Sequence, residues 1–237
     1  MNELNLSKRL KTVASFIPKG AVLADIGSDH AYLPCYAIIH KTASFAIAGE
    51  VSEGPFSSAL NQVRECELDD FISVRKGDGL EVINSSVTCI TVAGMGGELI
   101  KSILENGKEK LTNVKTLILQ PNIHAIIIRK WLLNQGWELK NEVIIEEDGK
   151  IYEILVAEKG DSYEPYNPSI FEEQLLLGPF LMAKKEPVFM KKWLLEQDHL
   201  EKVLKQMEMA KQDEKNKKKK LELTNKLTMI KGALSDE

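Results

Sequence analysis

The segment Asp25-Ile26-Gly27-Ser28-Asp29-His30 follows a short apolar run and precedes a helical pattern, where α/β proteins place ligand loops. Gly27 permits a tight turn or a close approach to a ligand, and the helix behind it offers free backbone N–H groups. The dinucleotide pattern G-x-G-x-x-G is absent, because Asp29 occupies the place of its second glycine. A carboxylate there disfavours a pyrophosphate and favours a cationic ligand. The alternative is that Ser28 or Asp29 only caps the helix.

Two acidic residues end the next two predicted strands. Glu50 lies about 23 residues after Gly27, near the offset at which an acid binds ribose hydroxyls in nucleotide-binding folds. Asp78, between Gly77 and Gly79, can accept a hydrogen bond from an adenine amino group. Each has an ordinary alternative, since acids are common at strand ends and aspartate is common in turns.

Glycines and amides follow the fourth and fifth predicted strands. Ala93-Gly94-Met95-Gly96-Gly97 lets the backbone approach a ligand closely, although a flexible loop explains it too. In Gln120-Pro121-Asn122-Ile123-His124 two amides surround a proline and can form one wall of a base pocket, or Asn122 can be the N-cap of the next helix. Because the carboxyl ends of parallel strands share one edge, these features together predict a nucleoside-type cofactor. S-adenosyl-L-methionine (SAM), with its sulfonium and amino groups, suits the acidic loop.

Several classes of protein are disfavoured by composition. The four histidines show no metal-ligand spacing such as H-E-x-x-H, so we predict no metal. The three cysteines, Cys35, Cys66 and Cys89, lie far apart, and the chain shows no signal segment, which favours a reducing cytoplasm. No apolar run approaches the roughly 20 residues of a membrane helix, so no membrane span is expected.

The net charge of −4 conceals a difference between the two parts of the chain. Residues 168–237 hold 14 lysines and 12 acidic residues, hence +2, which leaves −6 for residues 1–167. A basic surface for nucleic acid must therefore be local. The candidates lie in the first predicted helix and the tail: Lys8, Arg9, Lys11, Lys184, Lys185, Lys191, Lys192 and the run 217–220. A solvated helix face is the alternative interpretation of such charges.

The elements that position these residues alternate between strand and helix patterns. We predict strands at 22–26, 45–49, 72–75, 89–93 and 116–119, with helices of about 10 to 16 residues between them, which indicates a parallel sheet. Two further strands, 138–146 and 152–157, are joined only by Glu147-Asp148-Gly149-Lys150, a hairpin turn. A Rossmann-like α/β sheet of seven strands that ends in an antiparallel pair favours a methyltransferase over a dehydrogenase.

The tail is predicted to be helical. Residues 161–168, with two tyrosines and two prolines, form the predicted linker between a domain at 1–160 and one at 169–237. Helices are expected at 169–185, from Pro187 and from about Glu214. The apolar residues of the last two helices repeat at intervals of three and four, as in a coiled-coil hairpin: Leu200, Val203, Met207 and Ala210, then Leu223, Leu227, Ile230 and Leu234.

The chain resembles the bacterial tRNA (adenine-22-N1)-methyltransferase family along essentially its whole length. Six segments carry the resemblance, in order: Leu6-Ser7-Lys8-Arg9-Leu10, Asp25 to Pro34, Ala48-Gly49-Glu50-Val51, Gly77-Asp78-Gly79-Leu80, Ala93 to Gly97, and Leu119-Gln120-Pro121-Asn122. The tail is similar in helical layout only.

The resemblance implies a class I SAM-dependent methyltransferase domain and a helical domain that grips tRNA. It implies that SAM is bound by Asp25, Gly27, Asp29, Glu50, Asp78, Gly79, Gly94 and Met95. The target base would face the catalytic candidates Asp29, His30, Tyr32 and Asn122 together with Arg9, and Lys8 and Arg9 would contact RNA. The partner would be tRNA in the cytoplasm, and a monomer is the default expectation for the oligomeric state.

The implied reaction is methylation of N1 of adenine. N1 has a lone pair, so positioning supplies most of the catalysis, and we hypothesise that Asp29 stabilises the cationic product ring. The alternatives are a methyltransferase with a different acceptor and a SAM- or nucleotide-binding module without catalysis, whose helical arm binds partners. A dehydrogenase is the remotest alternative.

Overall fold

The computed structural model describes residues 4–208 and 214–235. The chain divides into two compact units, an N-terminal unit (residues 1–165) and a helical unit (residues 166–237). The division falls inside the segment 161–168 that the sequence indicates as a linker. Ala210, predicted in the helical hairpin, lies outside the described residues.

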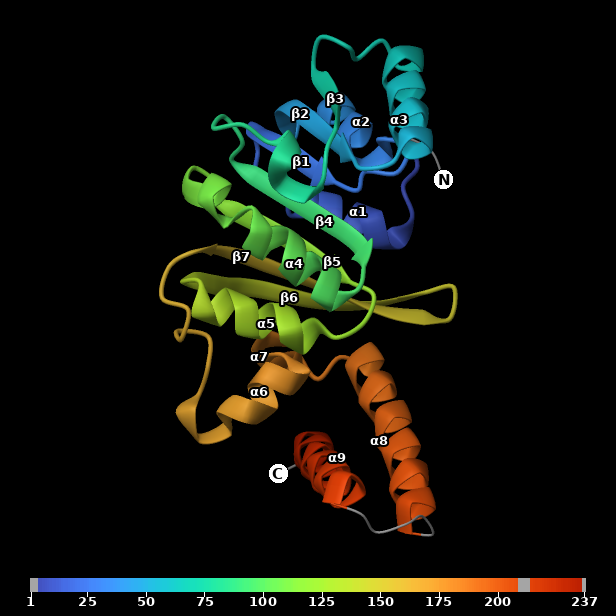
Figure 1. Cartoon of the computed structure of the whole chain (residues 1–237), viewed down its shortest axis with the longest axis vertical. Helices are drawn as coiled ribbons and strands as arrows, with labels where there is room; N and C mark the ends of the chain where they lie inside the picture. Colours follow the sequence, from blue (N-terminus) through green and yellow to red (C-terminus); the bar gives the residue numbers. More distant parts are fainter. Residues whose placement is uncertain (1–3, 209–213, 236–237) are drawn as a thin grey trace. The chain divides into compact units, whose positions relative to one another are not determined.

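The N-terminal unit is built on a seven-stranded sheet with the strand order β3-β2-β1-β4-β5-β7-β6 (Figure 1). Strands β1 to β5 are parallel, and β7 is antiparallel to both β5 and β6. The predicted Rossmann-like sheet with an antiparallel terminal hairpin is confirmed. The strands are β1 Ala21–Ile26, β2 Ala43–Glu50, β3 Ile72–Lys76, β4 Cys89–Met95, β5 Thr116–Pro121, β6 Trp137–Glu147 and β7 Lys150–Lys159.

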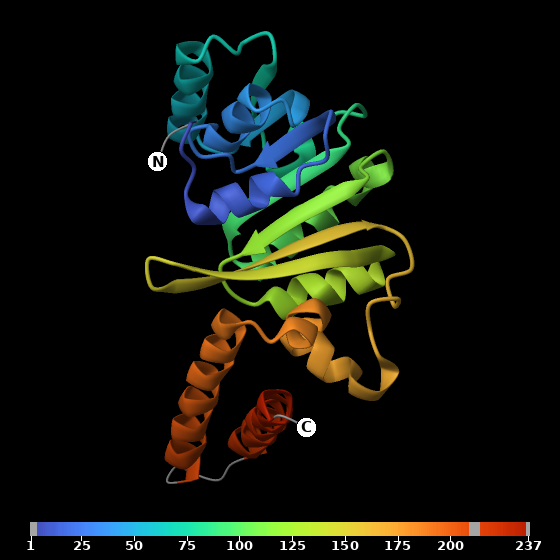
Figure 2. The same ribbon diagram turned by 180° about the vertical axis from the view of Figure 1, so that it is seen from behind.

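Helices cover both faces of the sheet. They are α1 Lys8–Ser15, α2 Tyr32–Ile39, α3 Glu53–Glu65, α4 Gly97–Asn106 and α5 Ala125–Asn134. Helices α1, α2 and α3 bury residues such as Val13, Leu33 and Val63 in one core cluster with the strands. Helices α4 and α5 lie in front of the sheet in Figure 1, whereas α1 is in front in Figure 2.

The connection from β3 to β4 differs from the prediction. A helix of about 10 to 16 residues was expected, but the connection contains only a 3-10 turn, η1 Gly79–Val82. Residues 77–88 include two glycines and the polar run Asn84-Ser85-Ser86. Both features disfavour helix, because glycine has high backbone entropy and Asn and Ser side chains compete for backbone hydrogen bonds.

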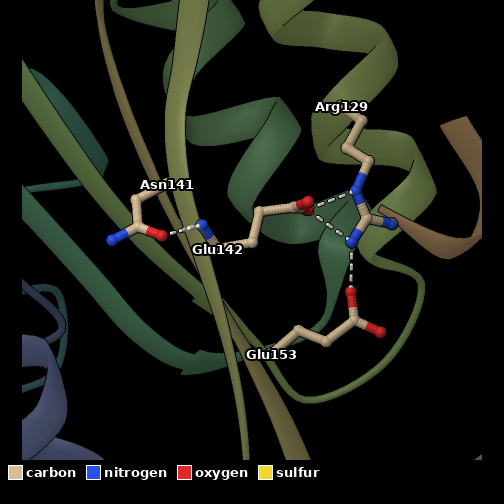
Figure 3. A network of polar contacts seen from close by, with 4 residues as sticks. All are labelled: Arg129, Asn141, Glu142 and Glu153. Atoms are coloured by element: carbon tan, nitrogen blue, oxygen red, sulfur yellow. Dashed lines mark hydrogen bonds and ion pairs between the residues drawn. The ribbon is translucent and has the colours of Figure 1, made fainter. Parts of the chain in front are cut away.

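A buried ion triad joins α5 to both strands of the terminal hairpin, β6 and β7 (Figure 3). The Arg129 guanidinium of α5 donates to Glu142 of β6 and to Glu153 of β7, and all three side chains are buried. The distance from Arg129 Nε to Glu142 Oε1 is 2.7 Å. Asn141 Oδ1 accepts the Glu142 backbone N–H at 2.8 Å, beside the irregularity in the β6 register. The triad therefore fixes the position of α5 against the hairpin.

The helical unit comprises η3 Pro168–Ile170, α6 Phe171–Leu177, α7 Pro179–Lys184, α8 Pro187–Glu208 and α9 Glu214–Leu234. The prediction of one helix over 169–185 is wrong, because Gly178 adopts φ 95° and Pro179 begins a new helix. The predicted pairing of the last two helices is confirmed. Three ion pairs join α9 to α8: Lys226–Glu196, Lys231–Glu201 and Lys220–Glu208.

Candidate methyltransferase site

The carboxyl ends of β1 to β5 lie along one edge of the sheet. Ile26 at the end of β1 pairs with Gly49 of β2 and with Val92 of β4, and Ala93 pairs with Gln120 of β5. The strand order reverses at β1, whose neighbours are β2 and β4. Open α/β sheets bind ligands at this edge and at such a reversal. The loops that follow these strands carry most of the predicted site residues.

The loop after β1 has an unusual backbone. Gly27 has φ 71°, and its N–H donates to Gly49 O at 2.9 Å. The next left-handed residues are three in a row, and none is a glycine: Asp29, His30 and Ala31 have φ 41°, 65° and 54°. Left-handed backbone at such residues is uncommon and concentrates at functional sites. The alternative that Ser28 or Asp29 caps the helix is wrong, because α2 begins at Tyr32 after Ala31.

Glycines at this edge bring the loops after β1 and β4 together. A Cβ on Gly27 would overlap Cε of Met95, so the Met95 side chain lies directly against the Gly27 backbone. Gly94 has φ 81° and lies where the register of β4 and β5 is irregular. This bulge turns the Gly94 N–H away from the ladder to the side chain of Gln120.

Asp25 lies beneath the loop rather than at its surface. The carboxylate is 4% exposed and accepts hydrogen bonds from Ser28 Oγ at 2.7 Å and Thr91 Oγ1 at 2.6 Å. Burial raises the pKa of Asp25 from 3.8 to about 6, although both hydroxyls oppose the rise. Asp25 therefore connects the β1 loop to β4, and the structure places it as a support of the loop.

Glu50 is the carboxylate that organises the acidic part of the site. It is buried at the end of β2 and accepts the backbone N–H of Asp29. Burial raises the pKa of Glu50, and the Asp29 N–H opposes the rise. The side chains of Asp29 and His30 are exposed, with 3.7 Å between Oδ1 and Nε2, and the His30 ring stacks on Tyr32 at 5.3 Å between centroids. Four of the predicted site residues thus lie side by side: Asp29, His30, Tyr32 and Glu50.

Asp78 and Gly79 lie after β3. Asp78 is exposed and is the N-cap of η1, and its backbone N–H donates to Glu81 Oε2 at 3.0 Å. Gly79 has φ 52°. Within the described part of the chain, these two residues make no hydrogen bond or ion pair with the loops after β1 and β4. Strand β3 is parallel to β2, however, and ends beside Glu50, which pairs with Lys76.

Helix α1 reaches the same edge through Arg9. Arg9 Nη1 donates to Gln120 Oε1 at 2.6 Å, and its guanidinium lies 5.5 Å from the centre of the Tyr152 ring. The Arg9 backbone N–H donates to Glu147 Oε1 at 3.3 Å. Lys8 is exposed, and its ammonium donates to the Glu146 carbonyl at 3.2 Å. Both basic residues are therefore anchored to the end of the β6–β7 hairpin.

Asn122 is held by the loop after β4. Its Nδ2 donates to Gly94 O at 2.8 Å, its Oδ1 accepts from Gln120 Nε2 at 3.2 Å, and its backbone N–H donates to Met95 O. The alternative that Asn122 is the N-cap of α5 is wrong, because His124, at φ 63°, precedes the helix. The exposed amide retains one N–H and one lone pair for a ligand.

Some residues of this edge were missed by sequence reasoning. Thr91 and Tyr152 stand inside strand patterns, and nothing in their spacing marks them. Gln120 belongs to the Gln-Pro-Asn motif, so a signal existed, but its contact with Arg9 joins residues far apart in the sequence. Among residues 4–208 and 214–235, no group of His, Cys, Asp and Glu is arranged to hold a metal ion. No helix in the same ranges has the length and apolar content to cross a membrane.

Comparison with known proteins finds relatives that match nearly the whole chain. Residues 23–232 match the family described as tRNA (adenine(22)-N(1))-methyltransferase. The protein of that name from Bacillus subtilis is 55% identical over 235 residues, with 99% of each chain covered. The crystal structure of the B. subtilis M1A22 tRNA methyltransferase TrmK superposes with a TM-score of 0.95 at 53% identity, covering 98% of this chain and 100% of that one.

A further solved structure carries the methyl donor. The Streptococcus pneumoniae protein Sp1610, in complex with S-adenosyl-L-methionine, has a TM-score of 0.86 at 42% identity, covering 98% of this chain and 100% of its own. The match of sequence and fold extends over nearly the whole chain. The chain therefore belongs to the tRNA (adenine(22)-N(1))-methyltransferase family.

Proposed function

We propose that this chain transfers the methyl group of SAM to N1 of adenine 22 in tRNA. The observation that carries the proposal is the convergence of Gly27, Glu50, Met95 and Asn122, from the ends of four adjacent strands, at one edge of the sheet. The names of the B. subtilis relatives supply the acceptor, and the Sp1610 complex supplies the methyl donor.

The residues at this edge fit SAM. The left-handed backbone at Gly94 allows main chain to approach a ligand without a Cβ between them, whereas at Gly27 the missing Cβ makes room for the Met95 side chain. The carboxylates of Glu50 and Asp29 suit a ligand that carries ribose hydroxyls and positive charge. We therefore assign contact with SAM to seven of the eight residues that the resemblance indicates: Gly27, Asp29, Glu50, Asp78, Gly79, Gly94 and Met95. Asp25, the eighth, supports the β1 loop from beneath. When bound, SAM supplies an electrophilic methyl group on a cationic sulfur.

The base would lie against the side chains that border this edge of the sheet. We assign it to Asp29, His30, Tyr32 and Asn122, with Arg9 beside them. The His30 and Tyr32 rings stack on each other and can extend this stack to a base, and the remaining N–H and lone pair of Asn122 can bind a base edge. The chain must hold an adenine whose N1 is free of base pairing, which costs roughly a few kcal/mol when the base leaves its stack.

Asp29 is proposed to stabilise the positive charge that develops on the ring. Its carboxylate is exposed, while its backbone is fixed by Glu50. Asp29→Asn removes the charge and keeps a residue that tolerates left-handed backbone. We expect kcat at saturating SAM to fall about 10- to 100-fold, a larger effect than the accompanying rise in the Kd of SAM. A normal kcat combined with a weaker Kd would instead make Asp29 a residue of cofactor binding alone.

We further propose that the helical unit and the basic residues Lys8 and Arg9 grip the tRNA backbone. Lysines on α8 and α9 supply the positive charge that the N-terminal unit lacks. A tRNA partner places the proposed reaction in the cytoplasm, and we propose that the chain acts as a monomer. Light scattering after size exclusion, with and without tRNA, tests that state.

Methylation of defined transcripts tests the function. Purified protein is incubated with SAM and an unmodified tRNA transcript, and N1-methyladenosine is measured by nucleoside mass spectrometry. The matched control is the same transcript with adenine 22 replaced by guanine. We expect N1-methyladenosine in the first transcript only. Equal methylation of both transcripts would show a different position, and binding of SAM without methylation would show a binding module.

A further inference from the structure

The side chain of Gln120 links three segments of the candidate site and has no part in the proposed reaction so far. It is fully buried near the end of β5. Its Oε1 accepts from Arg9 Nη1 at 2.6 Å and from the Gly94 N–H at 2.9 Å, and its Nε2 donates to Asn122 Oδ1 at 3.2 Å. One amide therefore joins α1, the β4 loop and the β5 loop.

The partners of Gln120 fix the direction of its amide. A guanidinium and a backbone N–H can only donate, so the atom that faces Arg9 and Gly94 must be the oxygen. The NH₂ group then faces Asn122, whose own oxygen must accept. This in turn aims the Asn122 NH₂ group at Gly94 O, 2.8 Å away. A buried side chain thus sets which way an exposed amide points.

Gln120 cannot itself contact a base. Both lone pairs of its oxygen and one of its N–H groups are taken by protein, and the side chain has no exposed surface. Any influence on the reaction must pass through its three partners, Arg9, Gly94 and Asn122, which remain partly or fully exposed.

We propose that Gln120 is a positioning residue for methyl transfer, which holds the Asn122 amide and the Arg9 guanidinium in the directions that receive the target base. The proposal rests on the proposed function, because that function places the base against these two residues.

Gln120→Glu is the sharpest variant. Glutamate has nearly the same shape, still accepts from Arg9 and Gly94, and adds a charge that favours Arg9. It cannot donate to Asn122 Oδ1, so the Asn122 amide must rotate and give up its bond to Gly94 O. We expect kcat on unmodified tRNA to fall about 10- to 100-fold, with the KM of SAM changed less than about threefold. The same exchange at Gln135, exposed at the end of α5, is the matched control and should leave both constants unchanged.

A double-mutant cycle distinguishes positioning from a structural role. Gln120→Glu, Asn122→Ala and the double variant are compared for kcat, with thermal unfolding measured on each. If Gln120 acts through Asn122, the kcat of the double variant is little lower than that of the more impaired single variant. Multiplied losses would overturn the proposal, and so would an unchanged kcat in the folded Gln120→Glu protein.

A second cycle with Gln120→Met covers poor folding of the glutamate variant. If neither variant folds, Gln120 is a residue of stability and the proposal is wrong. The wild-type chain is assayed first on both transcripts. Absence of methylation by the wild-type chain would overturn the proposed function. If the wild-type chain methylates tRNA, the kcat of the Gln120 variants tests the positioning role alone.

Discussion

The carboxyl of Asp25 is held where its protonated form is favoured. Burial raises its pKa to about 6, and this effect outweighs the hydrogen bonds from Thr91 and Ser28, which favour the charged form. The folded chain consequently binds this proton more tightly than the unfolded chain does. The contribution of Asp25 to stability is therefore most favourable below about pH 4, and it decreases as pH rises towards 6.

Asp25→Asn should remove this pH dependence. The asparagine amide keeps the shape, and the two hydroxyls can rotate to suit it. We expect the free energy of unfolding of the variant, relative to wild type, to rise between pH 4 and 7 by on the order of 2 to 3 kcal/mol. Thermal unfolding of both proteins at pH 4, 5, 6 and 7 measures the difference. Parallel curves would show that the Asp25 carboxyl titrates normally in the folded chain.

The sequence predicts which residues lie at this edge of the sheet better than it predicts their backbone conformation. Gly27, Glu50, Gly94 and Asn122 stand directly after predicted strands, and the parallel sheet collects such positions wherever it forms. The left-handed run that begins at Asp29 has no glycine to announce it. It depends on the hydrogen bond to Glu50, 21 residues away, and such a tertiary contact has no local signal.

At the scale of elements, the start of α4 is packed against the loop before α5. A Cβ on Gly97 would overlap the carbonyl oxygen of His124 and lie 3.1 Å from that of Ile123. These are backbone atoms, so Gly97→Ala must push the two loops apart. We expect a loss of about 1–3 kcal/mol in the free energy of unfolding, with lower methyltransferase activity.

Gly54→Ala is the matched control for this change. Gly54 lies in the first turn of α3 with nothing within 4 Å of its added Cβ. Alanine there should stabilise by roughly 0.5–1 kcal/mol and leave activity unchanged. Urea denaturation of both variants makes the comparison. Equal behaviour of the two variants would mean that the Gly97 contact is loose.

The buried triad makes a second prediction at this scale. Arg129→Met leaves the carboxylates of Glu142 and Glu153 buried without their cation, so we expect a loss of about 3–5 kcal/mol. The triple variant Arg129→Met, Glu142→Leu, Glu153→Leu should recover much of it, because an apolar group needs no counter-charge. Denaturant midpoints measure both. Lys108→Met, which breaks an exposed ion pair with Glu105, is the control and should not shift the midpoint.

Strands were easier to predict than connections. The short β-branched runs of β1, β4 and β5 are buried on both faces, and Asp148-Gly149 supplies the two left-handed residues of the hairpin turn. The error at 169–185 arose because its apolar pattern continues through Gly178, while the backbone at that glycine does not. The periodicity of a sequence indicates which face of a helix is apolar. A single left-handed glycine can turn the chain without changing that periodicity.

For the whole molecule, charge separates the two units. The helical unit carries +2 and the remainder −6, so an anionic RNA is repelled by one and attracted by the other. Lysines of α9 are not equivalent in this respect. Lys226 and Lys231 pair with Glu196 and Glu201, whereas Lys218 and Lys219 have no carboxylate partner within the described ranges.

Unpaired lysines should therefore dominate the attraction for tRNA. We expect the double variant Lys218→Ala, Lys219→Ala to weaken binding and to reduce the slope of log K against log salt concentration by about 2, because up to two phosphate contacts are lost. The control is Lys19→Ala, Lys115→Ala, which removes the same charge near the amino ends of β1 and β5. Filter binding between about 50 and 200 mM salt gives both slopes. Equal slopes in the two double variants would mean that RNA senses the net charge of the chain and does not contact these lysines, and the helical unit would then lose its proposed role in gripping tRNA.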